Sequence, residues 1–254
     1  SWDREILDFV KVMEDFTGNK VDIDKLNQAI HIVNEKRKAL QRLYNCRKNT
    51  CVPISGRDVL LIMQIAFFDD PERLTAQVNT LCDELEKRIE EGISVSPKNA
   101  PRILLTGTPM AIPNWKMHNI VETSGGIVVC EENCTGTRYF TNTVKENNQT
   151  MEEAAASLTE RYFNNIHCAC FTPNPERIDD ILRLAKEYQV DGILNVNLKF
   201  CNLYATENYF VERRLKEEGY KVLSLETDYE DSDAEQLRTR VSAFLEMIEA
   251  NKTN

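Results

Sequence analysis

The chain has 254 residues, of which 42% are hydrophobic and 28% are charged, a balance typical of soluble globular proteins. Its formal net charge of −10 argues against a nucleic-acid-binding protein, because neutralising phosphates requires clustered Lys and Arg. No apolar run approaches the roughly 20 residues of a membrane-spanning helix and no signal peptide opens the chain, so we expect a cytoplasmic protein.

Residues 1–98 are expected to form a helical region that packs against a neighbouring domain. Apolar side chains recur at helical spacing over residues 6–13, and a second helix is expected from about residue 22 through Leu43. Ser55 has the type and position of an N-cap and predicts a third helix behind it, and a fourth helix follows Pro71. Because the chain opens without a methionine, we expect a processed protein or a piece of a longer one.

Short apolar runs alternate with helical segments beyond residue 101, which predicts βαβ units and a parallel sheet. We expect residues 99–254 to form a flavodoxin-like (Rossmann-like), doubly wound α/β lobe with strand order 2-1-3-4. The expected strands cover residues 103–106, 126–130, 192–196 and 222–225, and the expected helices cover 114–123, 151–164, 175–188, 206–218 and 232–249.

Two of the eight cysteines follow strands of this predicted sheet. Cys134 lies in the loop after the second strand, and Cys201 lies in the loop after the third. Ligands of such sheets bind beyond the carboxyl ends of the strands, so we expect both thiols on one rim. Because thiolate is the standard protein ligand of iron–sulfur clusters, the pair is a candidate metal half-site. The alternative is a pair of unrelated loop cysteines.

The other six cysteines give weaker signals. Residues 168–170 are expected to form a short buried segment, from which Cys168 can approach the same rim as a less favoured ligand. For the remaining four we expect structural positions, namely the core for Cys82 and Cys130 and a solvent-accessible polar turn between Cys46 and Cys51.

Several common catalytic motifs are missing from the sequence. It contains no glycine-rich dinucleotide fingerprint, no P-loop and no nucleophile elbow. The three histidines, His31, His118 and His167, have no partners that the sequence identifies, although His167 adjoins Cys168. The sequence therefore identifies no catalytic acid, base or nucleophile.

Five sequence blocks occur in a diagnostic order, at residues 103–109, 132–136, 168–174, 190–201 and 225–229. Together they resemble the 2-hydroxyacyl-CoA dehydratase / benzoyl-CoA reductase family, and the resemblance covers nearly the whole chain. The combination of Glu132-Asn133-Cys134, the Cys168-x-Cys170 segment and residues 204–207 is most similar to the double-cubane cluster branch.

The resemblance implies two Rossmann-like lobes with an iron–sulfur cluster between them, either [4Fe–4S] or a double-cubane [8Fe–9S] cluster. Family members receive electrons from a separate ATP-hydrolysing iron–sulfur activator. On this pattern Cys134 and Cys201 are cluster ligands. Backbone N–H groups are expected to contact the cofactor near Thr106, Gly107, Thr135 and Gly136, and Arg138 and Lys199 lie near the rim.

We therefore expect the iron–sulfur component of an ATP-dependent, low-potential reductase of the double-cubane type that acts on a small molecule, and we expect a dimer. The first alternative is a 2-hydroxyacyl-CoA dehydratase subunit that acts on a CoA thioester by a ketyl-radical route. The second is a non-catalytic scaffold or assembly protein. Nothing in the sequence corresponds to the family's N-terminal lobe, so we expect this chain alone to bind no intact cluster and to be inactive.

Overall fold

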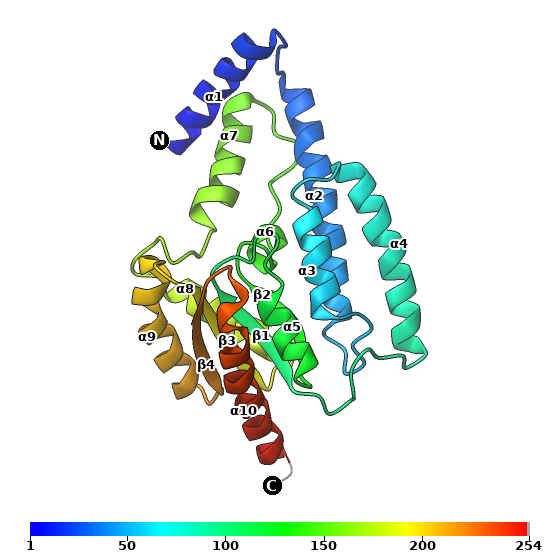
Figure 1. The fold of residues 1–254 in the computed structure, drawn as a ribbon. Coiled ribbons are helices and arrows are strands. Elements are labelled where there is room, and N and C mark those ends of the chain that lie inside the picture. Colours follow the sequence, from blue (N-terminus) through cyan, green and yellow to red (C-terminus); the bar gives the residue numbers. More distant parts are fainter. Residues whose placement is uncertain (253–254) are drawn as a thin grey trace.

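A computed structural model describes residues 1–252 (Figure 1). Four helices make up most of the first 90 residues, as predicted. The side-chain oxygen of Ser55 accepts a hydrogen bond from the Asp58 N–H at 3.0 Å, which confirms the predicted N-cap. The four helices are α1 (Trp2–Thr17), α2 (Ile23–Cys46), α3 (Gly56–Ile65) and α4 (Pro71–Glu90).

The rest of the described chain is built on one parallel sheet of four strands in the order β2-β1-β3-β4. This order confirms the flavodoxin-like prediction. The strands are β1 (Arg102–Gly107), β2 (Ile127–Glu132), β3 (Gly192–Leu198) and β4 (Val222–Thr227).

Helices connect the strands. They are α5 (Lys116–Thr123), α6 (Thr137–Phe140), α7 (Met151–Thr159) with a π-helical turn (Glu160–Asn164), α8 (Pro175–Glu187), α9 (Asn202–Glu217) and α10 (Ala234–Lys252), the last preceded by a 3-10 turn (Asp231–Asp233). Residues 253–254 of the expected lobe lie outside the described residues.

The sheet is covered on both faces, because alternate residues of each buried strand point to opposite sides. Ile103 and Leu105 pack with α5 and α10, whereas Leu104 and Ile193 pack with α8 and α9 on the other face (Figure 1). Core residues of α2, α3 and α4 belong to the same cluster as Leu104. The helical region and the sheet thus share one core, and the proposed boundary at residue 98 stays a prediction.

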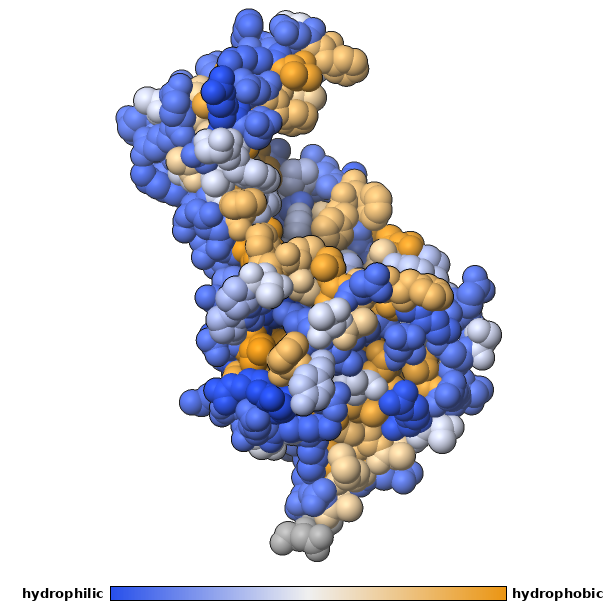
Figure 2. Space-filling model, turned by 90° about the vertical axis from the view of Figure 1, so that its left-hand side faces the viewer, coloured by the Kyte–Doolittle hydropathy of each residue, from blue (hydrophilic) through white to orange (hydrophobic). Residues whose placement is uncertain are grey.

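Helices α1 and α7 and the adjoining part of α2 extend away from the sheet (Figure 1). Figure 2 shows hydrophobic side chains on this extension and across the middle of the same face. Phe9, Val12 and Phe16 of α1 are exposed. Among the described residues, no helix is both long and apolar enough to cross a membrane.

The structure corrects three local expectations. β2 ends two residues later than predicted, so Glu131 and Glu132 are buried strand residues and not loop residues. The turn after Cys46 is not fully solvent-accessible, because Arg47 is completely buried and pairs with Glu131 at 2.8 Å. Helix α9 begins at Asn202, four residues earlier than expected, which places Cys201 at its N-cap.

The predicted core positions of Cys82 and Cys130 are confirmed.

Candidate metal centre

Four cysteines from three segments come together beyond the carboxyl ends of the strands, and we call them the thiol rim. Cys134 follows β2, Cys201 follows β3, and Cys168 and Cys170 lie between the π-helical turn and α8. The sulfur atoms of Cys168 and Cys170 are 3.7 Å apart. The hydrogen bond with Cys168 raises the pKa of Cys170, and Cys134 and Cys201 raise it further. Hydrogen bonds to α9, which begins just after Cys201, hold the other two segments beside it. Arg138 lies 3.9 Å from the Cys134 sulfur and donates to Tyr204 of α9, and Asn174 donates both to the Cys168 carbonyl at 2.8 Å and to Glu207 of α9 at 3.1 Å.

Cys170 is a rim thiol that the sequence did not predict, because residues 168–170 were expected to be buried. The structure shows Ala169 buried but Cys170 exposed, so that expectation was wrong. Of the three residues, only the small Ala169 is buried, while Cys168 is partly exposed. The Cys-x-Cys spacing was the available signal, since two thiols at that separation in one short loop can face the same side.

Arg138 of α6 lies directly against the rim. Its Nη1 is 3.9 Å from the sulfur of Cys134 and donates to the Tyr204 hydroxyl at 2.7 Å, and its Nε donates to Glu132 Oε1 at 2.5 Å. Burial lowers the pKa of Arg138, but Glu132 outweighs it and raises that pKa above the usual value. Burial raises the pKa of Cys134, and Arg138 opposes that rise.

A second buried arginine extends this charge network below the rim. Arg177 of α8 donates to the Thr106 hydroxyl at 3.0 Å, pairs with Glu132 at 3.5 Å and forms an ion pair with Glu207. Thr106 in turn donates to Glu132 Oε2 at 2.5 Å. Arg138, Arg177, Glu132 and Glu207 therefore form a network with two positive and two negative charges, which makes their burial tolerable.

Two buried donors of this network, Nε of Arg177 and Nη2 of Arg138, have no hydrogen-bond partner among the described residues. Buried donors are normally satisfied, so an orphaned one calls for an explanation, such as a bound ion or water. An orphaned cationic donor beside four thiols suits an anionic bound group.

The loop residues predicted to contact a cofactor have clear roles within the chain. The Thr135 N–H donates to the side-chain oxygen of Asn133 at 3.0 Å, and the Gly136 N–H donates to the backbone carbonyl of Asn133 at 3.1 Å. Gly107 has a φ of +117°, and a Cβ there would lie 2.1 Å from the Val196 carbonyl oxygen. These residues shape the loops that carry the thiols. As cofactor contacts, Thr106, Gly107, Thr135 and Gly136 stay predictions.

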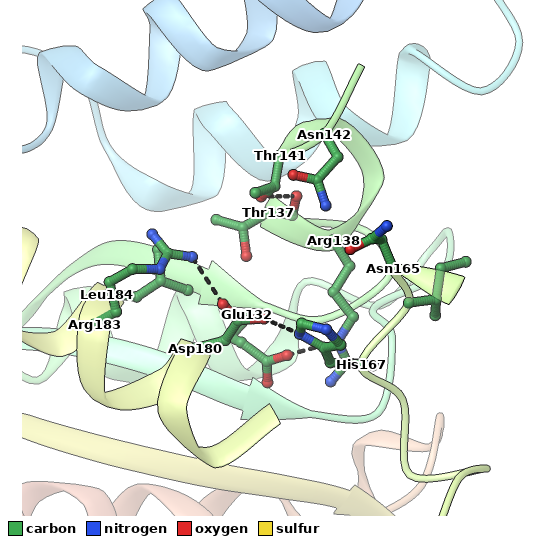
Figure 3. A pocket seen from close by; sticks show the side chains of 11 residues that line it. Glu132, Thr137, Arg138, Thr141, Asn142, Asn165, His167, Asp180, Arg183 and Leu184 are labelled. Carbon is green, nitrogen blue, oxygen red and sulfur yellow. Dashed lines mark hydrogen bonds and ion pairs between the residues drawn. The ribbon is translucent and has the colours of Figure 1, made fainter. Parts of the chain in front are cut away.

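A small polar pocket adjoins the network (Figure 3). Glu132 and Arg138 face it from one side, and His167 and Asp180, whose Nδ1 and Oδ2 are 2.6 Å apart, face it from the other. Its volume of about 30 Å³ has room for one or two water molecules. Lys199, the other cation predicted near the rim, pairs with Asp228 at 2.7 Å at the surface.

The donor set fits an iron–sulfur cluster, since such clusters are held mainly by thiolates. The expectation that this chain alone closes no cluster rested on two thiols. The structure adds Cys168 and Cys170 to the rim, with their sulfurs 3.7 Å apart, and the expectation that this chain alone binds no intact cluster stays a prediction.

The comparisons with known proteins identify a family and several relatives. The family model "2-hydroxyglutaryl-CoA dehydratase, D-component" matches residues 1–248. The chain is 34% identical to "Putative dehydratase subunit YjiM" of Escherichia coli (strain K12), over 97% of this chain and 63% of that protein. It is 25% identical to the (R)-phenyllactyl-CoA dehydratase beta subunit of Clostridium sporogenes, over 94% of this chain and 61% of the relative.

A more distant relative is a benzoyl-CoA reductase component of Thauera aromatica, 22% identical over 96% of this chain and 58% of the relative. The chain thus spans about three fifths of the length of these curated relatives.

Proposed function

Because this chain belongs to the 2-hydroxyglutaryl-CoA dehydratase, D-component, family, we propose that its thiol rim supplies ligands to an iron–sulfur cluster. The observation that carries the proposal is the convergence of four cysteines from three segments at one edge of the sheet. Cys134 and Cys201 are the first two ligands. A cluster bound there would supply electron transfer at low potential.

The spacing of Cys168 and Cys170 limits how the pair can bind. In a [4Fe–4S] cluster each of four thiolates binds a different iron. Two thiolates about 3.8 Å apart instead suit one tetrahedral ion with bonds of about 2.3 Å. At 3.7 Å, the two sulfurs are too close to serve two irons where they stand. We assign Cys168 as the third ligand, because it is partly buried beside the rim whereas Cys170 is exposed to solvent.

The charge network has a positioning role in this proposal. Arg138 touches the Cys134 sulfur, and Glu132 and Tyr204 fix its guanidinium in place. A fixed positive charge next to a thiolate stabilises the negative form that binds metal. The unpartnered Nη2 of Arg138 is a candidate donor to the bound group.

The activity proposed for the whole protein is a low-potential reduction of a small molecule, fed by a separate ATP-hydrolysing iron–sulfur activator. Support comes from the resemblance of Glu132-Asn133-Cys134, Cys168-x-Cys170 and residues 204–207 to the double-cubane branch. The remaining ligands would come from the N-terminal lobe of family members, and the assembly would be a dimer.

A second candidate is a subunit of a 2-hydroxyacyl-CoA dehydratase. It is favoured by the relatives, several of which are named as subunits of CoA-thioester dehydratases. The two candidate functions differ in whether the protein needs a CoA thioester as its substrate. Reduction of small molecules without any thioester supports the reductase, whereas acyl-CoA bound to the purified full-length protein supports the dehydratase.

Serine substitution in the full-length protein tests the ligand assignment. Cys134→Ser and Cys201→Ser should each lower the iron content and the cluster absorbance after anaerobic reconstitution. Cys51→Ser is the matched control, because Cys51 lies away from the rim and its sulfur donates to the Ile93 carbonyl at 2.9 Å. Unchanged iron content in both rim variants would refute the assignment and leave the scaffold alternative.

Comparing Cys168→Ser with Cys170→Ser tests the third ligand. The first should lose iron and the second should keep it. The reverse result would make Cys170 the ligand.

A further inference from the structure

A histidine and two glutamates outside the thiol rim form a second group of metal-ligating side chains. His31 and Glu35 lie one turn apart on α2, and Glu146 reaches them from the loop between α6 and α7. One ligand atom of each lies within 4.8 Å of the other two. We propose that these three residues bind a divalent cation, and that Zn²⁺ is the best match to one imidazole nitrogen and two carboxylate oxygens.

The loop that carries Glu146 is attached to α2 on both sides of this triad. Asn34 donates to the Val144 carbonyl at 2.7 Å and accepts from the Val144 N–H at 3.0 Å. On the other side of Glu146, the Asn27 side chain donates to the Asn148 carbonyl at 2.8 Å and accepts from the Asn148 N–H at 3.0 Å. The helix that supplies two ligands thus also fixes the backbone that supplies the third, and such preorganisation lowers the cost of binding.

The carboxylate of Glu146 is itself oriented. Its Oε1 accepts from Asn34 Nδ2 at 2.9 Å, and its Oε2 lies 3.1 Å from His31 Nδ1. The hydrogen bonds from Asn34 and His31 lower the pKa of Glu146, so the carboxylate is ionised at neutral pH. A ligand held by a second hydrogen bond in this way is typical of metal sites.

Charge and exposure define what the site can bind. A neutral imidazole with two carboxylates carries two negative charges, which a divalent cation balances. The His31 side chain is 56% exposed, so water can complete the coordination. Lys38, which pairs with Glu35 at 2.7 Å, is exposed and must move aside, so the affinity will be modest.

Calorimetric titration with Zn²⁺ tests the proposal in the full chain with the four rim cysteines replaced by serine, since thiolates would otherwise compete for the ion. We expect one Zn²⁺ per chain and a loss of affinity of about tenfold or more in Glu146→Gln. The matched control is Glu152→Gln, which removes the same charge from an exposed residue of α7 outside the triad. Absence of binding, or equal binding in the two glutamine variants, would overturn the proposal.

A titration of the unsubstituted chain with Co²⁺ avoids any dependence on the serine variant. Co²⁺ at the rim gives sulfur-to-metal charge-transfer bands, whereas Co²⁺ at the triad has only nitrogen and oxygen ligands and lacks them. We expect a second binding phase without these bands that Glu146→Gln and His31→Gln both abolish. A titration that shows only the phase with sulfur-to-metal charge-transfer bands would contradict the proposal.

Discussion

The sulfur atoms of Cys168 and Cys170 lie 3.7 Å apart, and Cys170 is exposed to solvent. A disulfide requires about 2.05 Å, which a rotation of the two side chains can reach. We expect this pair to oxidise first when the chain is treated with oxidised glutathione, with release of two molecules of reduced glutathione per disulfide formed. Peptide mapping by mass spectrometry identifies the bond.

Two comparisons make this prediction specific. Cys170→Ser should abolish the early disulfide, while Cys51→Ser should leave it unchanged. Cys46 and Cys82 are buried and should remain thiols under the same mild treatment. A disulfide at Cys46 or Cys82 that forms first would contradict the prediction.

Replacing Arg138 should destabilise the chain much more than replacing the other rim cation. Arg138→Ala leaves the buried Glu132 with one ion pair instead of two, and we expect a loss of about 3 kcal/mol in the free energy of unfolding. Lys199→Ala removes an exposed pair with Asp228, which solvent screens, and should change the unfolding free energy far less. Urea unfolding of both variants measures the difference, and equal losses would show that the network is not coupled to stability.

Acid should weaken the fold through Glu131. Burial alone raises the pKa of Glu131, but Arg47 and His118 outweigh it and hold the pKa at about 2, against an ordinary value of 4.5. A carboxylate with a lowered pKa stabilises the folded state above the unfolded-state pKa. That contribution, about 3 kcal/mol at pH 7, should be lost as the pH falls from about 4.5 towards 2.

Urea unfolding across this pH range measures the effect. Glu131→Gln should flatten the dependence on pH, because the amide does not titrate. It should also lower stability at neutral pH by about 3–5 kcal/mol, since Arg47 loses its buried counter-charge. An acid slope that is the same in the variant would exclude Glu131 as its source.

Gly107→Ala should be costly because two constraints meet at this position. The backbone has a positive φ, and the added Cβ would clash with the Val196 carbonyl of the neighbouring strand. We expect a loss of about 3 kcal/mol or more in unfolding free energy. Gly219 also has a positive φ but has open space around it, so Gly219→Ala should cost only about 1–2 kcal/mol. Thermal unfolding of the two variants separates the clash from the backbone strain.

Local patterns in the sequence predicted the elements and their order. The four N-terminal helices and the order β2-β1-β3-β4 followed from apolar periodicity and from the rule that parallel strands alternate with helices. The same rule placed Cys134 and Cys201 after β2 and β3, the two strands that flank β1. These predictions succeeded because each depends on residues close together in the chain or on a general topology.

Side-chain partners required the folded chain. The burial of Arg47 depends on Glu131, 84 residues away, and the contact of His31 with Glu146 spans 115 residues. Neither pairing has a local signature, because it depends on how α2 packs against β2 and the loop before α7. The sequence by itself thus determined the fold class and two of the rim thiols. It also named Cys168 as a less favoured ligand at the same rim. Only packing revealed Cys170 as a rim thiol, the buried charges below the rim and the second group of ligands.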